Sequence, residues 1–424
     1  MSTDDTALAP EAARAAHRVA LAAWVVAWLA CITILAAVHY TSGDPDSRLY
    51  AGISARLVTE PVERWIAPEW WGFWGLTGPY HEHPVGMFVV PALGGRLGYP
   101  PEQTAYAINA LYQVLSFALI VAIARAVSTP SEARALGWVL QLLPIAFVFR
   151  IRANQEYAVL AAWLFALYAT ERARTRPVWT AGMLAGFCGV LLVKGVFAFM
   201  VPVGSVMWLI ARGRVVAHAS DASLGRHPFA AWVGVGLMPF AGVLITWGYE
   251  IMYLHVTGRS FLETYLARQV PEGALTEGSP AVRTSYSLVW YLGRLAWFAF
   301  PWSLVAVWGA AMAAHADGLR TFAPITERAP VDRSWQGVWF AVWTSALLVG
   351  AFSLAHRKAD RYIFPVYFLL AAPGVVYAIR RWPWMRRIVS RLDRPWVPAA
   401  VYTLLFLLRL VTRGKLPEFT FWRS

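Results

Sequence analysis

Charged residues and cysteines are scarce in this sequence. Only 14% of its 424 residues are Asp, Glu, Lys or Arg, against roughly 25% in an average soluble domain. The two cysteines, Cys31 and Cys188, lie within apolar runs, so we expect them to pack as small hydrophobic side chains rather than to form a disulfide or a thiolate metal site. These shortages exclude a soluble globular protein, a disordered chain and a small disulfide scaffold.

Long apolar runs take the place of the missing charge. Hydrophobic residues make up 58% of the chain and 23 residues are Trp. Because a bilayer core requires roughly 20 apolar residues per helix, we predict an all-α polytopic membrane protein with about 11 transmembrane helices. The chain would form a single domain over residues 1–424, with spans near 18–39, 104–127, 133–149, 154–171, 178–193, 195–211, 229–254, 286–313, 337–355, 361–379 and 395–412. The break near Lys194 is either a tight turn between two helices or one broken helix.

The positive charges suggest an orientation. With the N-terminus in the cytoplasm, the inside segments hold more Lys and Arg than the outside loops. The apolar run 19–38 is too long for the core of a signal peptide, which favours a retained first span. We therefore expect a multi-pass protein with its N-terminus in the cytoplasm. The Ala/Arg/Trp-rich composition is associated with a bacterial plasma (inner) membrane, which is the expected location. The net charge of +13 does not gather in a soluble basic segment, so nucleic acid is a poor partner.

Two outer loops are large enough to carry structure. Residues 40–103 form the first extracytoplasmic loop and residues 257–284 the second. In the first, residues 46–59 have the spacing of an amphipathic helix, and residues 84–97 suit a short re-entrant or interfacial helix. The segment 65–74 holds four tryptophans, which is typical of a segment that lies on the membrane surface. Together these segments would cover a cavity that opens to the outer face.

Ionisable residues gather at the predicted outer ends of the helices. Four groups stand out: Asp44 and Asp46; His81, Glu82 and His83; Arg150, Arg152 and Glu156; and Lys194 with Arg357, Lys358, Arg361 and Tyr362. Cations suit the oxygens of a phosphate or pyrophosphate headgroup, and a nearby carboxylate suits a general base. Sugar transfer from a lipid phosphate requires both.

The acidic and histidine groups also have simpler explanations. Asp44 and Asp46 fit a solvated loop or a helix cap. His81 and His83 fit loop histidines or a metal pair.

The cations likewise have alternatives. Arg150 and Arg152 fit side chains that snorkel to lipid headgroups, and residues 356–361 fit an ordinary basic loop. Lys194 is harder to dismiss, because it lies between two apolar runs. Arg294 lies inside the eighth span; Glu250 or another buried acid is a candidate partner, and the sequence does not place it.

Several short motifs resemble those of one enzyme family. They are Asp46-Ser-Arg-Leu-Tyr50, His83-Pro84-Val85, Val193-Lys194-Gly195, Arg357-Lys358-Ala-Asp-Arg-Tyr362-Ile-Phe-Pro365 and Phe300-Pro301-Trp302-Ser303. In this order the sequence is similar to the GT-C membrane glycosyltransferases, particularly the bacterial branch with the lipid A aminoarabinose transferase and relatives of protein O-mannosyltransferases. Ser47 departs from the Glu of the first motif, which puts in doubt a metal site built on paired acids.

The resemblance implies roles for these residues. Asp46 would be the catalytic base, Asp44 its rival and Glu156 a second acid. The predicted donor-phosphate site comprises His83, Arg150, Arg152, Lys194, Arg357, Lys358 and Tyr362. Tyr50, Glu82 and His81 would contact substrate. No residue is assigned to a metal, although a divalent ion stays open.

The favoured function is an inverting glycosyltransferase that uses a sugar linked to polyprenyl phosphate. Its partners would be this lipid, membrane lipids and an acceptor glycan, lipid or protein on the extracytoplasmic face. Two alternatives remain: a transporter or flippase of lipid-linked sugars, which would carry internal repeats and broken helices, and a non-catalytic assembly subunit.

Overall fold

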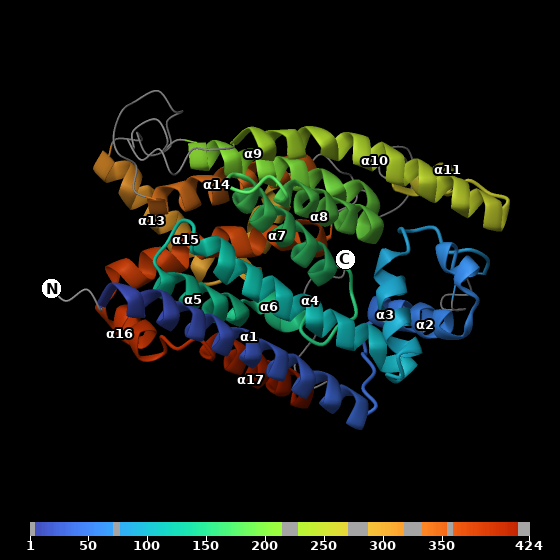
Figure 1. Ribbon diagram of the computed structural model, residues 1–424, viewed down its shortest axis with the longest axis horizontal. Helices are drawn as coiled ribbons and strands as arrows, with labels where there is room; N and C mark the ends of the chain where they lie inside the picture. The colour runs from blue at the N-terminus through green and yellow to red at the C-terminus, as the bar shows by residue number, and fades with distance from the viewer. Residues whose placement is uncertain are drawn as a thin grey trace.

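The described part of the protein is built from helices. The computed structural model describes residues 5–70, 77–213, 228–269, 287–317, 333–353 and 359–413. Within these ranges the only β-type pairing is one isolated bridge between Glu69 and Pro79. Figure 1 shows the longer helices side by side. The short helices Pro45–Thr59 and Gly86–Arg96 lie at the right-hand end of this bundle. The predicted all-α fold is confirmed.

Seventeen α-helices follow one another along these ranges. Their bounds are α1 Asp5–Ala37, α2 Pro45–Thr59, α3 Gly86–Arg96, α4 Pro101–Ala124, α5 Pro130–Val139, α6 Pro144–Val148, α7 Glu156–Ala173, α8 Trp179–Lys194, α9 Met200–Gly213, α10 Pro228–Thr257, α11 Phe261–Gln269, α12 Ser287–Phe298, α13 Trp302–Asp317, α14 Arg333–Ser353, α15 Phe364–Arg381, α16 Pro383–Arg391 and α17 Val397–Val411. Short 3₁₀ turns include η1 Val62–Ile66, η3 Leu140–Leu142, η4 Gly195–Phe199 and η8 Asp360–Ile363.

The lengths and hydropathies of these helices identify a multi-pass membrane protein. Six helical segments of the described chain are long and apolar enough to cross a bilayer, and α12 with α13, bent by 108°, would make up to seven. One of the six, Trp179–Gly213, comprises α8, η4 and α9 taken together. Each of the predicted span ranges contains helix, but some of these helices fall short. For example, α17 has 15 residues, and residues 133–149 are divided into α5, η3 and α6. The count of about 11 spans therefore stays a prediction.

The chain reverses direction between α8 and α9. Gly182 of α8 packs against Ala169 of α7, and Gly186 packs against Ala162, so α7 and α8 are antiparallel. The next helix runs back along α7. The indole of Trp163 donates to the Met200 carbonyl at 2.9 Å, and the hydroxyls of Thr170 and Ser205 lie 3.1 Å apart. Of the two interpretations of the break near Lys194, the tight turn is correct.

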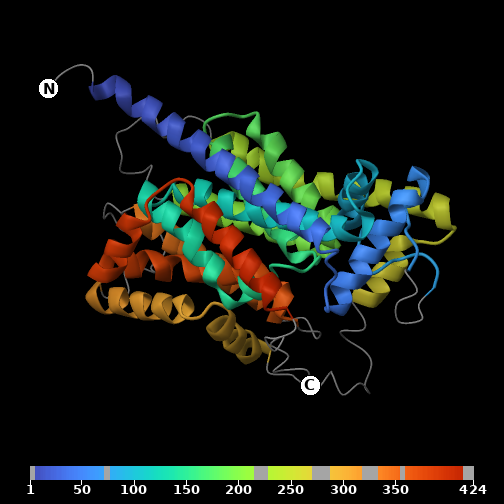
Figure 2. The same cartoon turned by 90° about the horizontal axis from the view of Figure 1, so that it is seen from below.

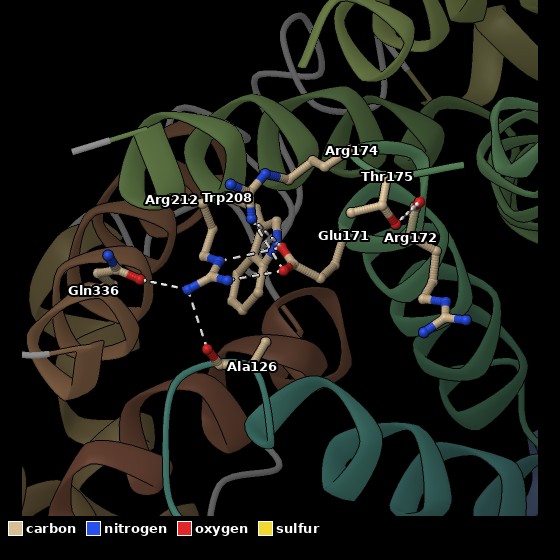
Figure 3. A network of polar contacts seen from close by, with 8 residues as sticks. All are labelled: Ala126, Glu171, Arg172, Arg174, Thr175, Trp208, Arg212 and Gln336. Atoms are coloured by element: carbon tan, nitrogen blue, oxygen red, sulfur yellow. Dashed lines mark hydrogen bonds and ion pairs between the residues drawn. The ribbon is translucent and has the colours of Figure 1, made fainter. Parts of the chain in front are cut away.

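A polar network joins four helices at the far end of α7 from Glu156. The Glu171 carboxylate accepts hydrogen bonds from Arg174, Trp208 and Arg212 (Figure 3). Arg212 also donates to the Ala126 carbonyl and to Gln336, which ties α4, α7, α9 and α14 together (Figure 3). Fifteen residues separate Glu156 from Glu171, a rise of about 22 Å along a helix. The network therefore holds these four helices together at the end of α7 that lies opposite Glu156.

Helices α2 and α3 lie beside one end of the bundle, as both views show (Figures 1 and 2). They agree with the two helices expected in the first loop. The tryptophan segment differs from expectation where it is described, because Trp65 and Trp70 are each only 5% exposed. Arg96 stacks on Trp65 at 4.5 Å, and the Tyr249 hydroxyl of α10 donates to the Ile66 carbonyl at 3.1 Å. These two indoles form a core under α10 instead of a membrane-facing surface; Trp71 and Trp74 lie outside the described residues.

Candidate active site

The first turn of α2 places two carboxylates at the edge of the bundle. Asp44 is the N-cap of α2, where its side chain accepts the Ser47 amide at 3.0 Å. It also lies 3.2 Å from the Arg152 guanidinium. The cap explanation is therefore confirmed for Asp44. Asp46, in the first turn, has its side chain 36% exposed and forms an ion pair with Arg361 of η8.

The segment that leads into α7 is held in place by polar side chains of α4. Gln113 donates to the Arg150 carbonyl at 2.7 Å, and Asn109 donates to the Arg152 carbonyl. The Ser47 hydroxyl lies between the carboxylate of Asp44 and the amide oxygen of Asn154, and it accepts the Ala153 amide at 3.2 Å. Ser47 thus joins the start of α2 to the start of α7.

Lys194 and Glu156 form a buried ion pair between the end of α8 and the start of α7. Lys194 Nζ lies 3.2 Å from Glu156 Oε1, and the two side chains are 4% and 2% exposed. The ammonium also lies 4.6 Å from the ring centre of Phe197 and 5.8 Å from that of Tyr362. A buried lysine needs such compensation, because removing an ammonium from water is costly.

Glycine is required at the turn that follows Lys194. Gly195 has φ +57°, and a Cβ there would lie 2.3 Å from the Tyr265 hydroxyl. That hydroxyl accepts the Val196 amide at 3.1 Å and reaches the Lys194 carbonyl at 3.5 Å. Tyr265 belongs to α11, which stacks on α10 through Phe261. The Lys-Gly pair of the sequence motif therefore forms a turn that α11 holds in position.

The turn η8 carries three adjacent residues that contact three different elements. Asp360 pairs with Arg294 of α12 at 3.0 Å, Arg361 pairs with Asp46 of α2, and the Tyr362 ring packs against Phe197 of η4 at 5.3 Å. Arg294 therefore pairs with an acid that is only partly buried, since the Asp360 side chain is 31% exposed. That acid is not Glu250, which accepts the Leu262 amide at 2.8 Å.

The Tyr50 ring lies among the charges of these pairs. Burial raises the pKa of Tyr50 well above its usual value; the charge of Arg361 opposes this rise, and Asp46, Glu156 and Glu82 add to it. The hydroxyl therefore stays protonated and neutral. The Lys194 ammonium lies 5.8 Å from the ring centre of Tyr362, the residue after Arg361, so the Asp46–Arg361 and Glu156–Lys194 pairs lie near each other. We refer to these four charged residues as the cluster.

Several predicted residues lie elsewhere or outside the described chain. Arg150 is only 1% exposed; it donates to the Gln141 carbonyl at 2.9 Å and stacks on Tyr402 at 5.1 Å. Its side chain is therefore held in the core beside Tyr402 and not with the cluster, which leaves it no contact with a phosphate bound there. Arg357 and Lys358 lie outside the described residues.

The histidine-containing loop is beside the cluster. His81 Nδ1 lies 3.1 Å from the Pro79 carbonyl, and the His81 ring contacts Trp70. Glu82 follows Tyr80 by two residues, and the rings of Tyr80 and Tyr50 both contact Phe88 of α3. His83 comes next in the chain, three residues before α3 begins. In the part of the chain that the structure describes, no group of three His, Cys, Asp or Glu residues could hold a metal ion.

Several residues that build the site are not predicted from the sequence. Arg361 was noted only as one of several cations, and nothing in the sequence pairs it with Asp46, 315 positions away. Asn154 and Tyr265 carry no charge, so a search for ionisable clusters passes over them. Their neighbours Glu156 and Lys194 could have drawn attention to both segments.

An apolar cavity of the described chain lies apart from the cluster. It has a volume of about 120 Å³ and lies between α4, α5, α7, α9, α14 and α15. Its lining is apolar and includes Trp163, Trp208 and Phe368. Such a lining supplies neither a base nor a phosphate ligand.

Comparison with known proteins supports the family resemblance. Residues 82–247 match the family described as dolichyl-phosphate-mannose-protein mannosyltransferase. No curated protein sequence matches the chain. Among solved structures, ArnT from Cupriavidus metallidurans bound to undecaprenyl phosphate is similar, with a TM-score of 0.63 at 15% identity over 92% of this chain and 76% of that one. Its apo form gives a TM-score of 0.54 at 17% identity over 93% and 78% of the two chains.

This chain shares the fold of ArnT. The likeness to ArnT runs over nearly the whole described bundle and confirms the fold implied by the sequence motifs. The matched segment 82–247 contains Glu156 and Lys194, so it includes one of the two ion pairs of the cluster.

Proposed function

We propose that the protein is an inverting glycosyltransferase that takes a monosaccharide from a polyprenyl phosphate. The observation that carries this proposal is the convergence of two carboxylate–cation pairs at one end of a fold like that of ArnT. Asp46 pairs with Arg361, Glu156 pairs with Lys194, and the Lys194 ammonium lies 5.8 Å from the ring of Tyr362, the neighbour of Arg361. The acceptor would be a lipid, glycan or protein. With the N-terminus in the cytoplasm, this end of the bundle faces the extracytoplasmic side of the plasma (inner) membrane.

The lipid carrier is proposed from the similar structure and from the charges. ArnT from Cupriavidus metallidurans was solved with undecaprenyl phosphate. In this chain, the Lys194 ammonium and the Arg361 guanidinium would take the phosphate oxygens, because cations in a partly dry site stabilise a departing phosphate strongly. His83, Arg152, Lys358 and Arg357 would complete the surroundings of the phosphate, and Tyr362 and Tyr50 would border the sugar.

Asp46 is the proposed catalytic base. The acceptor oxygen attacks the anomeric carbon from the side opposite the phosphate, and its proton passes to the Asp46 carboxylate. The bond between the anomeric carbon and the phosphate oxygen breaks, and its electron pair leaves with the lipid phosphate. Inversion follows from attack on the opposite face. Asp46 suits this role better than Asp44, which is 8% exposed and already occupied as the cap of α2. Glu156 positions Lys194.

A transfer assay in detergent tests the proposal. The purified protein is incubated with a radiolabelled polyprenyl-phosphate sugar and a lipid extract as a source of acceptors. We expect label to move from the donor to a new product, and we expect Asp46→Asn to abolish this transfer while still binding the donor. Donor binding without any transfer, combined with movement of the donor across sealed vesicles, would instead identify a transporter.

A further inference from the structure

The three carboxylates at the starts of α2 and α7 are each held by a cation in this structure. Asp46 contacts Arg361, Glu156 contacts Lys194, and Asp44 contacts Arg152. These contacts create a conflict for the proposed chemistry. A base has to present a carboxylate oxygen to the acceptor's proton, and a phosphate-binding cation has to present its N–H groups to the phosphate. Here the Asp46 oxygen and the Arg361 guanidinium occupy each other.

The two central pairs differ in their access to a ligand. The side chains of Arg361 and Asp46 are 33% and 36% exposed, whereas those of Lys194 and Glu156 are 4% and 2% exposed. Separating the buried pair would leave an uncompensated charge in a dry environment. The open pair has solvent beside it, so its partners can be exchanged more easily. An incoming anion would therefore compete for Arg361 rather than strip Lys194 from Glu156.

The backbone around Arg361 is fixed, so the exchange requires only a side-chain movement. Arg294 holds the neighbouring Asp360 side chain at 3.0 Å, and the Tyr367 hydroxyl donates to the Asp360 carbonyl at 3.2 Å. On the other side, Tyr362 packs against Phe197 and Phe352. The guanidinium is the free end of a long side chain on this anchored turn, and its planar donors match two oxygens of a phosphate.

We propose that the Asp46–Arg361 pair is a latch that the donor's phosphate opens. A lipid-linked phosphate takes the Arg361 guanidinium and releases the Asp46 carboxylate, so the base becomes available only when the donor is in place. Arg361 is then a donor-binding residue, and donor binding precedes productive acceptor binding. The inference rests on the proposed function, because it assumes that the anion is the donor's phosphate and that Asp46 is the base.

The test measures the reactivity of the Asp46 carboxylate in the full-length protein. A water-soluble carbodiimide with an amine labels accessible carboxylates, and mass spectrometry of the peptides reports the extent at Asp46. The probe is a polyprenyl monophosphate, and the uncharged polyprenol of the same length is the matched control. Glu69 serves as the internal reference. It also pairs with an arginine, Arg56 of α2, but both side chains are exposed and neither belongs to the cluster. Binding of each lipid is measured separately by calorimetry.

The latch predicts a several-fold rise in Asp46 labelling with the monophosphate, no rise with the polyprenol and no change at Glu69. It also predicts that Arg361→Gln labels strongly without lipid and gains nothing when the monophosphate is added, and that Arg361→Lys restores part of the wild-type response. If the monophosphate binds and Asp46 labelling stays equal or falls, the latch is wrong while the proposed function stands. If the monophosphate does not bind, both proposals fail.

Discussion

Lys194 and Glu156 lie 3.2 Å apart where the end of α8 passes the start of α7, and both side chains are almost completely buried. This contact joins the end of one helix to the start of its antiparallel neighbour. It places a positive charge where the first turn of α2 brings Asp46 and where η8 brings Arg361. Four segments that are far apart in the sequence therefore meet at one site: the start of α2, the start of α7, the end of α8 and the turn η8.

Removing one partner of this buried pair should destabilise the protein. We expect Glu156→Gln to cost about 3–5 kcal/mol, because it leaves the Lys194 ammonium without compensation. The double variant Glu156→Gln with Lys194→Met removes both charges and should recover much of the stability, but no transfer activity. Thermal unfolding in detergent gives the comparison. The exposed pair of Arg56 and Glu69 is the matched control, and Glu69→Gln should cost less than about 1 kcal/mol. A double variant as unstable as the single one would show that charge is not the cause.

The two aspartates of α2 should separate structure from catalysis. Asp44→Asn keeps a side chain that caps helices well, so we expect stability within about 1 kcal/mol of wild type and most of the transfer activity. Asp46→Asn should leave the unfolding temperature unchanged and lower transfer by about 100-fold or more, since it removes the proposed general base. The rates and unfolding temperatures of the two variants are measured side by side. Loss of transfer in Asp44→Asn with full activity in Asp46→Asn would exchange the two roles.

The turn after Lys194 should not tolerate a side chain. Gly195→Ala places a Cβ 2.3 Å from the Tyr265 hydroxyl at a φ of +57°, and the left-handed backbone alone costs about 1–2 kcal/mol. We expect a lower unfolding temperature and a raised KM for the lipid-linked donor, because the turn fixes Lys194. Gly236→Ala is the control: nothing lies within 4 Å of a Cβ at this helical position. Equal effects of the two substitutions would mean that the turn is not under constraint.

Protonation of Glu132, in the first turn of α5, should lower the stability of the protein in acid. Burial alone would raise the pKa of Glu132, but hydrogen bonds from Arg380 and Thr129 outweigh it and hold the pKa below its usual value of 4.5. A lowered folded-state pKa gives stabilisation that is complete above 4.5 and is lost as the pH falls through the lowered value. Unfolding temperatures measured across this range should decline less in Glu132→Gln. An identical decline would assign acid sensitivity to other groups.

Local patterns predicted much of the site's scaffold from the sequence. The apolar spacing and the cap at Asp44 predicted α2, and the lone Lys194 between apolar runs indicated a site residue. The prediction failed where direction depends on tertiary contacts. Arg150 and Arg152 are two positions apart, but they lie in an irregular segment, so one enters the core beside Tyr402 while the other pairs with Asp44.

Long-range partnerships explain the remaining differences. The tryptophan pattern suggested a segment on the membrane surface. Trp65 is instead buried, because Arg96 stacks on its ring and the Tyr249 hydroxyl of α10 donates to the neighbouring Ile66 carbonyl. Composition alone does not reveal these contacts. The pairing of Arg361 with Asp46 joins residues from opposite ends of the chain, and no local spacing encodes it. Ser47, which departs from the family motif, is explained by its contacts with Asp44 and Asn154.

The most direct test of this account is a cryo-EM structure of the protein with a bound polyprenyl monophosphate. The account predicts a phosphate within hydrogen-bond distance of Lys194 and Arg361, with Asp46 turned away from the guanidinium and toward the space beside the phosphate. A phosphate bound at the opposite end of α7, near Arg212 and Glu171, or a retained Asp46–Arg361 contact with the phosphate elsewhere, would contradict it.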